Sequence, residues 1–113
     1  MRGAVLLCMA VLMAVGCGTL YESPLHEEYS DEAGAFRGRW WSYYERGSWL
    51  LGQKAPDLAE ADLRQALAGN SRDAWQRRTY GLHFVEYFPN RELGIALFQQ
   101  GELDEAQQYL ERS

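Results

Sequence analysis

The sequence predicts an all-helical fold built from antiparallel helix pairs. The clearest evidence lies between Leu93 and Leu110, where apolar residues recur at the three- and four-residue spacing of amphipathic helices. Gly101 divides this stretch, and glycine is the residue that most readily ends a helix. Two short amphipathic helices joined by a glycine turn form an antiparallel pair, which needs neighbouring helices to cover its apolar side.

Residues 1–16 have the composition of an export signal. A basic start, Met1-Arg2, precedes an uncharged apolar run over residues 3–15, too short to span a bilayer comfortably but long enough for the core of a signal peptide. The run ends in Ala14-Val15-Gly16-Cys17, which resembles the lipobox of bacterial lipoproteins. The resemblance implies cleavage before Cys17, its lipidation, and, because Gly18 follows, sorting to the outer membrane. An ordinary cleaved signal peptide and an uncleaved membrane anchor are the alternatives.

Residues 17–35 are predicted to be a flexible acidic tether. This segment holds Ser23-Pro24 and many acidic residues, and its apolar residues show little periodicity. His26 stands alone within it, without a second ligand-type residue at metal-binding spacing. We therefore expect no metal site there.

The folded domain is predicted over residues 36–113. Trp40, Tyr43, Tyr44 and Gly47 follow the spacing of one helical face. The break at residues 52–56 ends this helix, Asp57 is a suitable N-cap for a second one, and Gly69-Asn70 ends that second helix.

The segment over residues 74–86 is predicted to be an inserted third helix that Asp73 caps. Tyr80, Phe84, Tyr87 and Phe88 would share one face of it, although Gly81 weakens a helix by ~1 kcal/mol relative to alanine. Pro89 then suits the first turn of the next helix. His83 is interpreted as a structural histidine, with a buried pH-sensitive group as the alternative.

Two stretches resemble the tetratricopeptide repeat (TPR), a 34-residue helix–turn–helix unit. In residues 87–113 the likeness rests on Leu93, Gly94, Leu97, Gly101, Leu103, Ala106 and Leu110. In residues 40–73 it rests on Tyr43, Gly47, Leu50, Ala59, Leu63 and Ala66, while Arg46 departs from the pattern where the other unit has Leu93. The resemblance implies a short right-handed array of helix pairs, with close helix contacts at Gly47, Gly94, Ala59 and Ala106.

In the TPR family, the first helix of each repeat lines a concave groove that binds an extended peptide or a partner helix. The resemblance implies that the groove in this chain is lined by Trp41, Tyr44, Ser48, Leu51, Phe88, Arg91, Ile95 and Phe98. Packing of these residues into the core is the alternative. Some TPR domains clamp a terminal carboxylate with basic and asparagine residues, which are missing here at Tyr44 and Ser48.

Composition and motifs argue against several classes of function. The net charge of −5 disfavours nucleic acid, which requires a basic surface. Cys17 is the expected acylation site, and His26 and His83 occur in unrelated contexts, so no nucleophile has an adjacent base. No glycine-rich phosphate loop is present. We expect neither an enzyme nor a bound cofactor or metal.

The sequence therefore predicts a membrane-anchored, TPR-like interaction adaptor or assembly scaffold on the periplasmic side of the bacterial outer membrane, with a protein partner. The alternatives are a structural, membrane-proximal part of a larger envelope assembly and the front of a longer TPR lipoprotein. Nothing in residues 111–113 can cover the last helix pair. Its apolar face, with Leu97, Leu103, Ala106 and Leu110, is expected to pair with another copy or a partner, or to be covered by sequence beyond Ser113.

Overall fold

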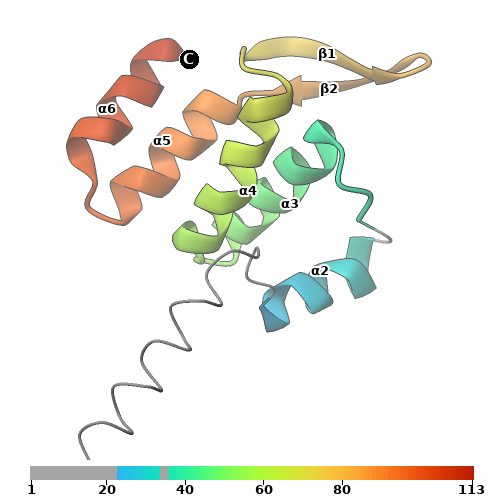
Figure 1. Ribbon diagram of the computed structural model, residues 1–113, viewed down its shortest axis with the longest axis horizontal. Coiled ribbons are helices and arrows are strands. Elements are labelled where there is room, and N and C mark those ends of the chain that lie inside the picture. Colours follow the sequence, from blue (N-terminus) through green and yellow to red (C-terminus); the bar gives the residue numbers. More distant parts are fainter. Residues whose placement is uncertain (1–22, 34–35) are drawn as a thin grey trace, which may run out of the picture.

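A computed structural model describes residues 23–33 and 36–113 of the chain (Figure 1). The elements in chain order are α2 (Pro24–Ala33), α3 (Trp40–Gly52), α4 (Pro56–Gly69), β1 (Ala74–Tyr80), β2 (His83–Tyr87), α5 (Pro89–Gln99) and α6 (Leu103–Arg112). Helices α3 and α4 form one pair, α5 and α6 form a second, and α4 packs against α5. The fold is thus mostly helical, with a small two-stranded sheet. The predicted signal peptide and Cys17 lie outside the described residues.

Most helix boundaries follow the predicted glycine and proline signals. Pro56 and Pro89 each begin a helix, where the missing proline N–H costs nothing. Gly101, between α5 and α6, adopts a φ of 84°, a conformation that glycine enters at little cost. The predicted N-cap is wrong: Ala55 occupies that position, and the Asp57 carboxylate lies in the first turn of α4, near the positive end of the helix dipole.

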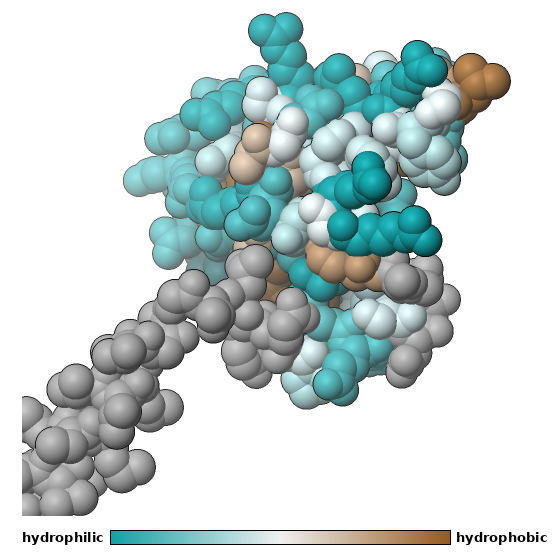
Figure 2. Space-filling model, turned by 45° about the vertical axis from the view of Figure 1, so that its right-hand side comes forward, coloured by the Kyte–Doolittle hydropathy of each residue, from teal (hydrophilic) through white to brown (hydrophobic). Residues whose placement is uncertain are grey.

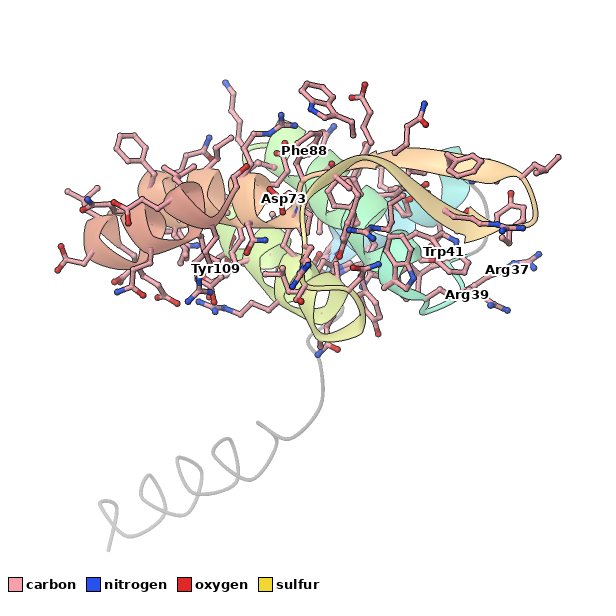
Figure 3. All side chains as sticks on the ribbon, turned by 90° about the horizontal axis from the view of Figure 1, so that it is seen from above. Arg37, Arg39, Trp41, Asp73, Phe88 and Tyr109 are labelled. Atoms are coloured by element: carbon pink, nitrogen blue, oxygen red, sulfur yellow. The ribbon has the colours of Figure 1, made fainter. Side chains whose placement is uncertain are left out.

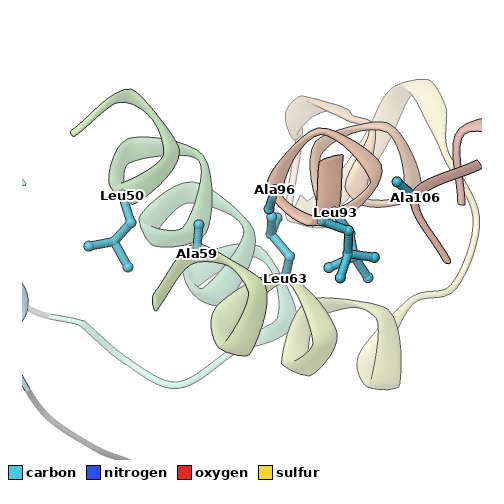
Figure 4. Packing of buried hydrophobic residues seen from close by; sticks show 7 residues of the cluster. Leu50, Ala59, Leu63, Leu93, Ala96 and Ala106 are labelled. Carbon is cyan, nitrogen blue, oxygen red and sulfur yellow. The ribbon is translucent and has the colours of Figure 1, made fainter. Parts of the chain in front are cut away.

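One hydrophobic core joins the two helix pairs (Figure 4). Its central leucines, Leu63 on α4 and Leu93 on α5, are both completely buried. The cluster consists of Leu50, Ala59, Leu63, Leu93, Ala96, Leu97 and Ala106.

Each helix pair has a close contact between its two helices, at the same place in both pairs. A Cβ atom added at Gly47 on α3 would lie 2.9 Å from Cγ of Leu63 on α4. A Cβ atom added at Gly94 on α5 would lie 2.6 Å from Cγ of Leu110 on α6. Each leucine follows its glycine by 16 residues (63 − 47 and 110 − 94). Both predicted glycine contacts are therefore confirmed, and they are equivalent.

The predicted inserted helix is wrong, because residues 74–87 form an antiparallel β-hairpin. The turn contains Gly81 with a φ of 52°, which a continuous helix does not permit. The aromatic and β-branched residues of this segment also suit strands, in which alternate side chains point to opposite faces. The aromatic spacing had fitted both interpretations.

Tyr87 attaches the base of this hairpin to the helices. Its side chain is fully buried, and burial raises the pKa of its hydroxyl above the ordinary value. The hydroxyl donates toward the carbonyl oxygens of Ala66, at 2.9 Å, and Asn70, at 2.5 Å. The ring packs edge-on against Trp40 and Tyr44, with centroid distances of 4.7 and 4.9 Å.

Asp73 caps a helix other than the predicted one. Its Oδ1 atom accepts hydrogen bonds from the backbone N–H of Asn90, at 2.9 Å, and from the Asn90 side chain, at 2.8 Å. The Asn90 amide also donates to the Ser71 carbonyl oxygen at 3.0 Å. Asp73 therefore satisfies the free end of α5 across the hairpin, since the segment directly after it is a strand.

The expectation of a flexible tether is wrong for residues 24–33, which form helix α2. Tyr29 is 9% exposed and its ring lies 5.3 Å from that of Trp49 on α3, while Leu25 packs against the core. Leu25 and Tyr29 are one helical turn apart, a two-residue apolar stripe among acidic residues. Within the described residues, no helix combines the length and the apolar character that a membrane span requires.

Arg46 and Asp62 form a buried ion pair between α3 and α4. The guanidinium donates two hydrogen bonds to the carboxylate, from Nε at 2.7 Å and from Nη2 at 2.8 Å. Both side chains are about 5% exposed or less. The guanidinium also lies 3.8 Å from the ring centroid of Phe36. This pairing explains how an arginine occupies a position where the other unit has a buried leucine, Leu93.

Candidate functional site

The eight predicted groove residues are divided between three regions of the molecule. Six of them are partly buried: Trp41, Tyr44, Ser48 and Leu51 on α3, Phe88 just before α5, and Ile95 on α5. The other two, Arg91 and Phe98, are exposed. Phe88 and Arg91 lie together, with the guanidinium 4.3 Å from the ring centroid. Burial raises the pKa of the nearby Tyr44 hydroxyl, and Phe88, Ser48 and Arg91 oppose that rise.

Tyr44 occupies the middle of the predicted groove. Its ring packs edge-on against Tyr87 and against the hydrophobic core. Burial raises the pKa of its hydroxyl, and the negative charge of Glu92 adds to that rise. Beside it, the Arg91 guanidinium lies 4.3 Å from the ring centroid of Phe88 and is paired with Glu92 at 3.0 Å. Tyr44 is therefore packed against the core, whereas Arg91 is exposed, and a peptide-binding groove at these residues stays a prediction.

Phe98 belongs to a different surface, at the end of the second helix pair. We use the term terminal face for the surface formed by Phe98, Leu103, Ala106, Gln107, Leu110 and Glu111, which line a hollow of about 410 Å³. Phe98, Leu103 and Leu110 are 61%, 58% and 41% exposed. Leu97 does not line this hollow and is only 1% exposed, so the expectation that it contributes to an open apolar face is wrong; Ala106 lines the hollow but is itself only 1% exposed.

Polar contacts hold α6, and with it the terminal face, against α4. The Arg64 guanidinium binds Glu105 on α6 at 2.6 Å and Glu60 on its own helix at 2.9 Å. Gln100 extends this network, because its side-chain amide donates to Glu60 at 2.8 Å. Arg64 also donates to the Tyr109 hydroxyl at 3.3 Å. Helix α6, which contributes most of the terminal face, is thus held against α4 by polar contacts of Glu105 and Tyr109 with Arg64.

Trp41 contributes to a third region, beside the hairpin. Arg37, Arg39, Trp41, Ser42, Glu45 and Tyr80 line a pocket of about 450 Å³. Figure 3 places Arg37, Arg39 and Trp41 under the hairpin, far from Tyr109 on α6. The Trp41 and Tyr80 ring centroids are 6.1 Å apart, and the Arg39 guanidinium lies 5.3 Å from the Trp41 ring.

The hairpin itself has exposed apolar residues, and the sequence analysis did not predict their exposure. Trp75, Tyr80, Leu82 and Phe84 are 73%, 61%, 89% and 50% exposed. His83 is exposed rather than buried: its ring stacks on Tyr80, and its Nδ1 atom lies 2.7 Å from the Thr79 hydroxyl. Two-residue alternation in a short hairpin could have indicated this surface, had the segment been interpreted as strand.

Metal-type side chains are dispersed in the part of the chain that the structure describes. No group of three or more His, Cys, Asp or Glu residues there is placed to hold a metal ion. His26 is buried, and its Nδ1 atom accepts a hydrogen bond from the Ser23 backbone N–H at 2.8 Å. Its surroundings are therefore those of a structural histidine.

Comparison with known proteins gave no match: no family model fits the chain, and no curated protein or solved structure is similar to it.

Proposed function

We propose that this chain is a lipid-anchored, TPR-like interaction adaptor of the bacterial cell envelope, and that its terminal face binds an amphipathic helix of a protein partner. The observation that carries the proposal is the exposure of Phe98, Leu103 and Leu110 around one hollow at the end of the helix array. In such an array each helix pair covers the apolar side of the pair before it, so an exposed face of this kind suits a helix.

The equivalent glycine–leucine contacts support the likeness to a repeat. Gly47 with Leu63, and Gly94 with Leu110, are close helix contacts at matching places in the two pairs. In the first pair Leu63 is fully buried, because α5 packs over α4. In the second pair Leu110 remains 41% exposed. A bound helix would bury Leu110 as α5 buries Leu63.

Charge favours a different protein over a second copy of this chain. Helix α6 and its approach carry Glu102, Asp104 and Glu111, with Arg112 as the only basic residue there, and Glu105 is already paired with Arg64 on α4. Two copies meeting face to face would bring these acidic rims together, and like charges across an interface oppose association. A partner helix with basic residues beside its apolar stripe would complement them.

Site-specific photo-crosslinking in the full chain tests this proposal. A photoreactive residue replacing Leu103 should give one discrete adduct with a different protein in the bacterial envelope, and one replacing Gln108, an exposed residue elsewhere on α6, should give none. Leu110→Asn should lower the yield at position 103 roughly tenfold, since burying a leucine contributes about 1.5–3 kcal/mol.

Two differently tagged copies expressed together distinguish the outcomes. An adduct containing both tags would make the terminal face a self-association surface and would favour the structural alternative. Equal labelling from positions 103 and 108 would remove the basis for a specific site.

Anchoring through Cys17 is a separate part of the proposal and has its own test. Cys17→Ser should abolish labelling by a fatty-acid probe and release the chain from the membrane fraction, because acyl chains on the cysteine provide the attachment. Cys8→Ser, within the apolar run, is the matched control and should leave the labelling unchanged. A Cys17→Ser chain that still incorporates the probe would contradict the lipoprotein assignment.

A further inference from the structure

The outer end of the β-hairpin exposes a group of apolar side chains. Leu82, in the turn, is 89% exposed, and Tyr80 and Phe84 on either side of it are 61% and 50% exposed. Figure 2 shows hydrophobic atoms at the protruding end of this part of the molecule, next to hydrophilic ones. The hairpin is attached at its other end, where Tyr87 is buried. A group of exposed apolar residues at a projecting end is typical of a contact site.

Arginines lie close to the same end, although the chain as a whole is acidic. Arg78 pairs with Phe84 across the two strands, and its Nε atom donates to the carbonyl oxygen of Gly81 in the turn. Arg37 and Arg39 line the pocket that Tyr80 closes from the hairpin side. Among the described residues that line this pocket, Glu45 alone is acidic. Positive charge is therefore concentrated around the apolar end.

We propose that this end of the hairpin is a second membrane contact, which inserts into the headgroup region of an anionic lipid surface. The residues succeed one another in the order that such a surface requires: an aliphatic side chain at the apex, then aromatic rings, then arginines. Leu82 enters furthest, Tyr80 and Phe84 lie at headgroup level, and Arg78, Arg37 and Arg39 bind lipid phosphates. The pocket beside Tyr80 and Trp41, of about 450 Å³, has room for a phosphate group between its two arginines.

The shape of this end favours a lipid surface over an acidic protein. The hairpin projects from the helices (Figure 1), so a protein partner would need a cleft that matches it, whereas a bilayer deforms around a projecting end. Basic residues close to an anionic bilayer each strengthen binding several-fold. The hairpin end also lies away from α6 in Figure 1, so this proposal does not depend on what the terminal face binds.

A fluorescent label at the apex tests the proposal in the full chain. With both cysteines replaced by serine, Leu82→Cys carries an environment-sensitive fluorophore, and Gln108→Cys on α6 provides the matched control. On vesicles containing phosphatidylglycerol, the label at position 82 should shift to the blue and be quenched by lipids brominated in their acyl chains. The label at position 108 should show neither effect. On pure phosphatidylcholine, the response at position 82 should fall several-fold.

Arg37→Gln combined with Arg39→Gln, in the chain labelled at position 82, should lower the response on anionic vesicles roughly tenfold and leave the circular dichroism unchanged. A label at position 82 that stays in water on both kinds of vesicle would overturn the proposal. A shift produced by polyglutamate but not by vesicles would overturn it in favour of an acidic protein. Equal responses on neutral and anionic vesicles would overturn the role of the arginines.

Discussion

Asp62→Ala should destabilise the fold by about 3–5 kcal/mol, the largest effect we expect from a single substitution in this chain. The carboxylate receives two hydrogen bonds from Arg46 at 2.7 and 2.8 Å, in a place where both side chains are about 5% exposed or less. Without it, the buried guanidinium loses two charge-assisted hydrogen bonds and the negative charge of Asp62 beside it. A domain of ordinary stability has only about 5–15 kcal/mol in total, so the loss should be plain in urea unfolding followed by circular dichroism.

Asp57→Ala is the matched control, because Asp57 is an exposed residue in the first turn of the same helix. It should cost less than about 1 kcal/mol, the usual size of an exposed charge at a helix end. The double variant Arg46→Met and Asp62→Leu should regain most of the lost stability, since apolar residues often replace a buried pair without net cost. If Asp62→Ala and Asp57→Ala cost the same, the pair contributes nothing specific.

The helix pairs could be predicted because their signals are local. Gly101, Pro56 and Pro89 act through their own backbone conformations, and apolar spacing reports the buried side of a helix. The contacts of Gly47 and Gly94 could be predicted too, since a small residue on an apolar stripe permits close approach of two helices.

The errors arose where distant residues decide the local structure. The spacing of the aromatic residues in 74–87 is compatible with a helix and with a hairpin. The hairpin is favoured because Tyr87, at its base, is buried and hydrogen-bonds to the carbonyl oxygens of Ala66 and Asn70. Asp73 is followed by a strand, so its capping of α5 depends on how the hairpin closes. Helix α2 depends on Trp49, which packs against Tyr29.

The surfaces were harder to predict than the helices. Among the groove residues carried over from the family, Tyr44 packs against Tyr87 from the hairpin, and Phe88 packs against Arg91. Phe98, a groove residue by the family resemblance, is exposed and lies on the terminal face. Which apolar side chains stay exposed depends on the packing of whole elements, and a spacing pattern does not contain that information.

Gly47→Leu should destabilise the fold by about 1–3 kcal/mol relative to Gly52→Leu, which makes the same change in the same helix. A Cβ atom at position 47 would lie 2.9 Å from Cγ of Leu63 and 3.2 Å from Cβ of Asp62, and Leu63 is fully buried. At position 52 nothing lies within 4 Å of an added Cβ atom. Helices α3 and α4 must move apart in the first variant and need not move in the second.

Gly47 lies in the interior of α3, where a better helix former contributes up to about 1 kcal/mol, whereas Gly52 is the last residue of that helix and gains less. The propensity term therefore favours Gly47→Leu, and a lower stability of that variant must come from packing. For a domain of this size, each kcal/mol corresponds to about 4–8 °C in the thermal midpoint. Thermal unfolding followed by circular dichroism should therefore place Gly47→Leu well below Gly52→Leu. Equal midpoints would mean that α3 and α4 do not approach closely at Gly47, and the equivalence with Gly94 and Leu110 would then no longer support a repeat.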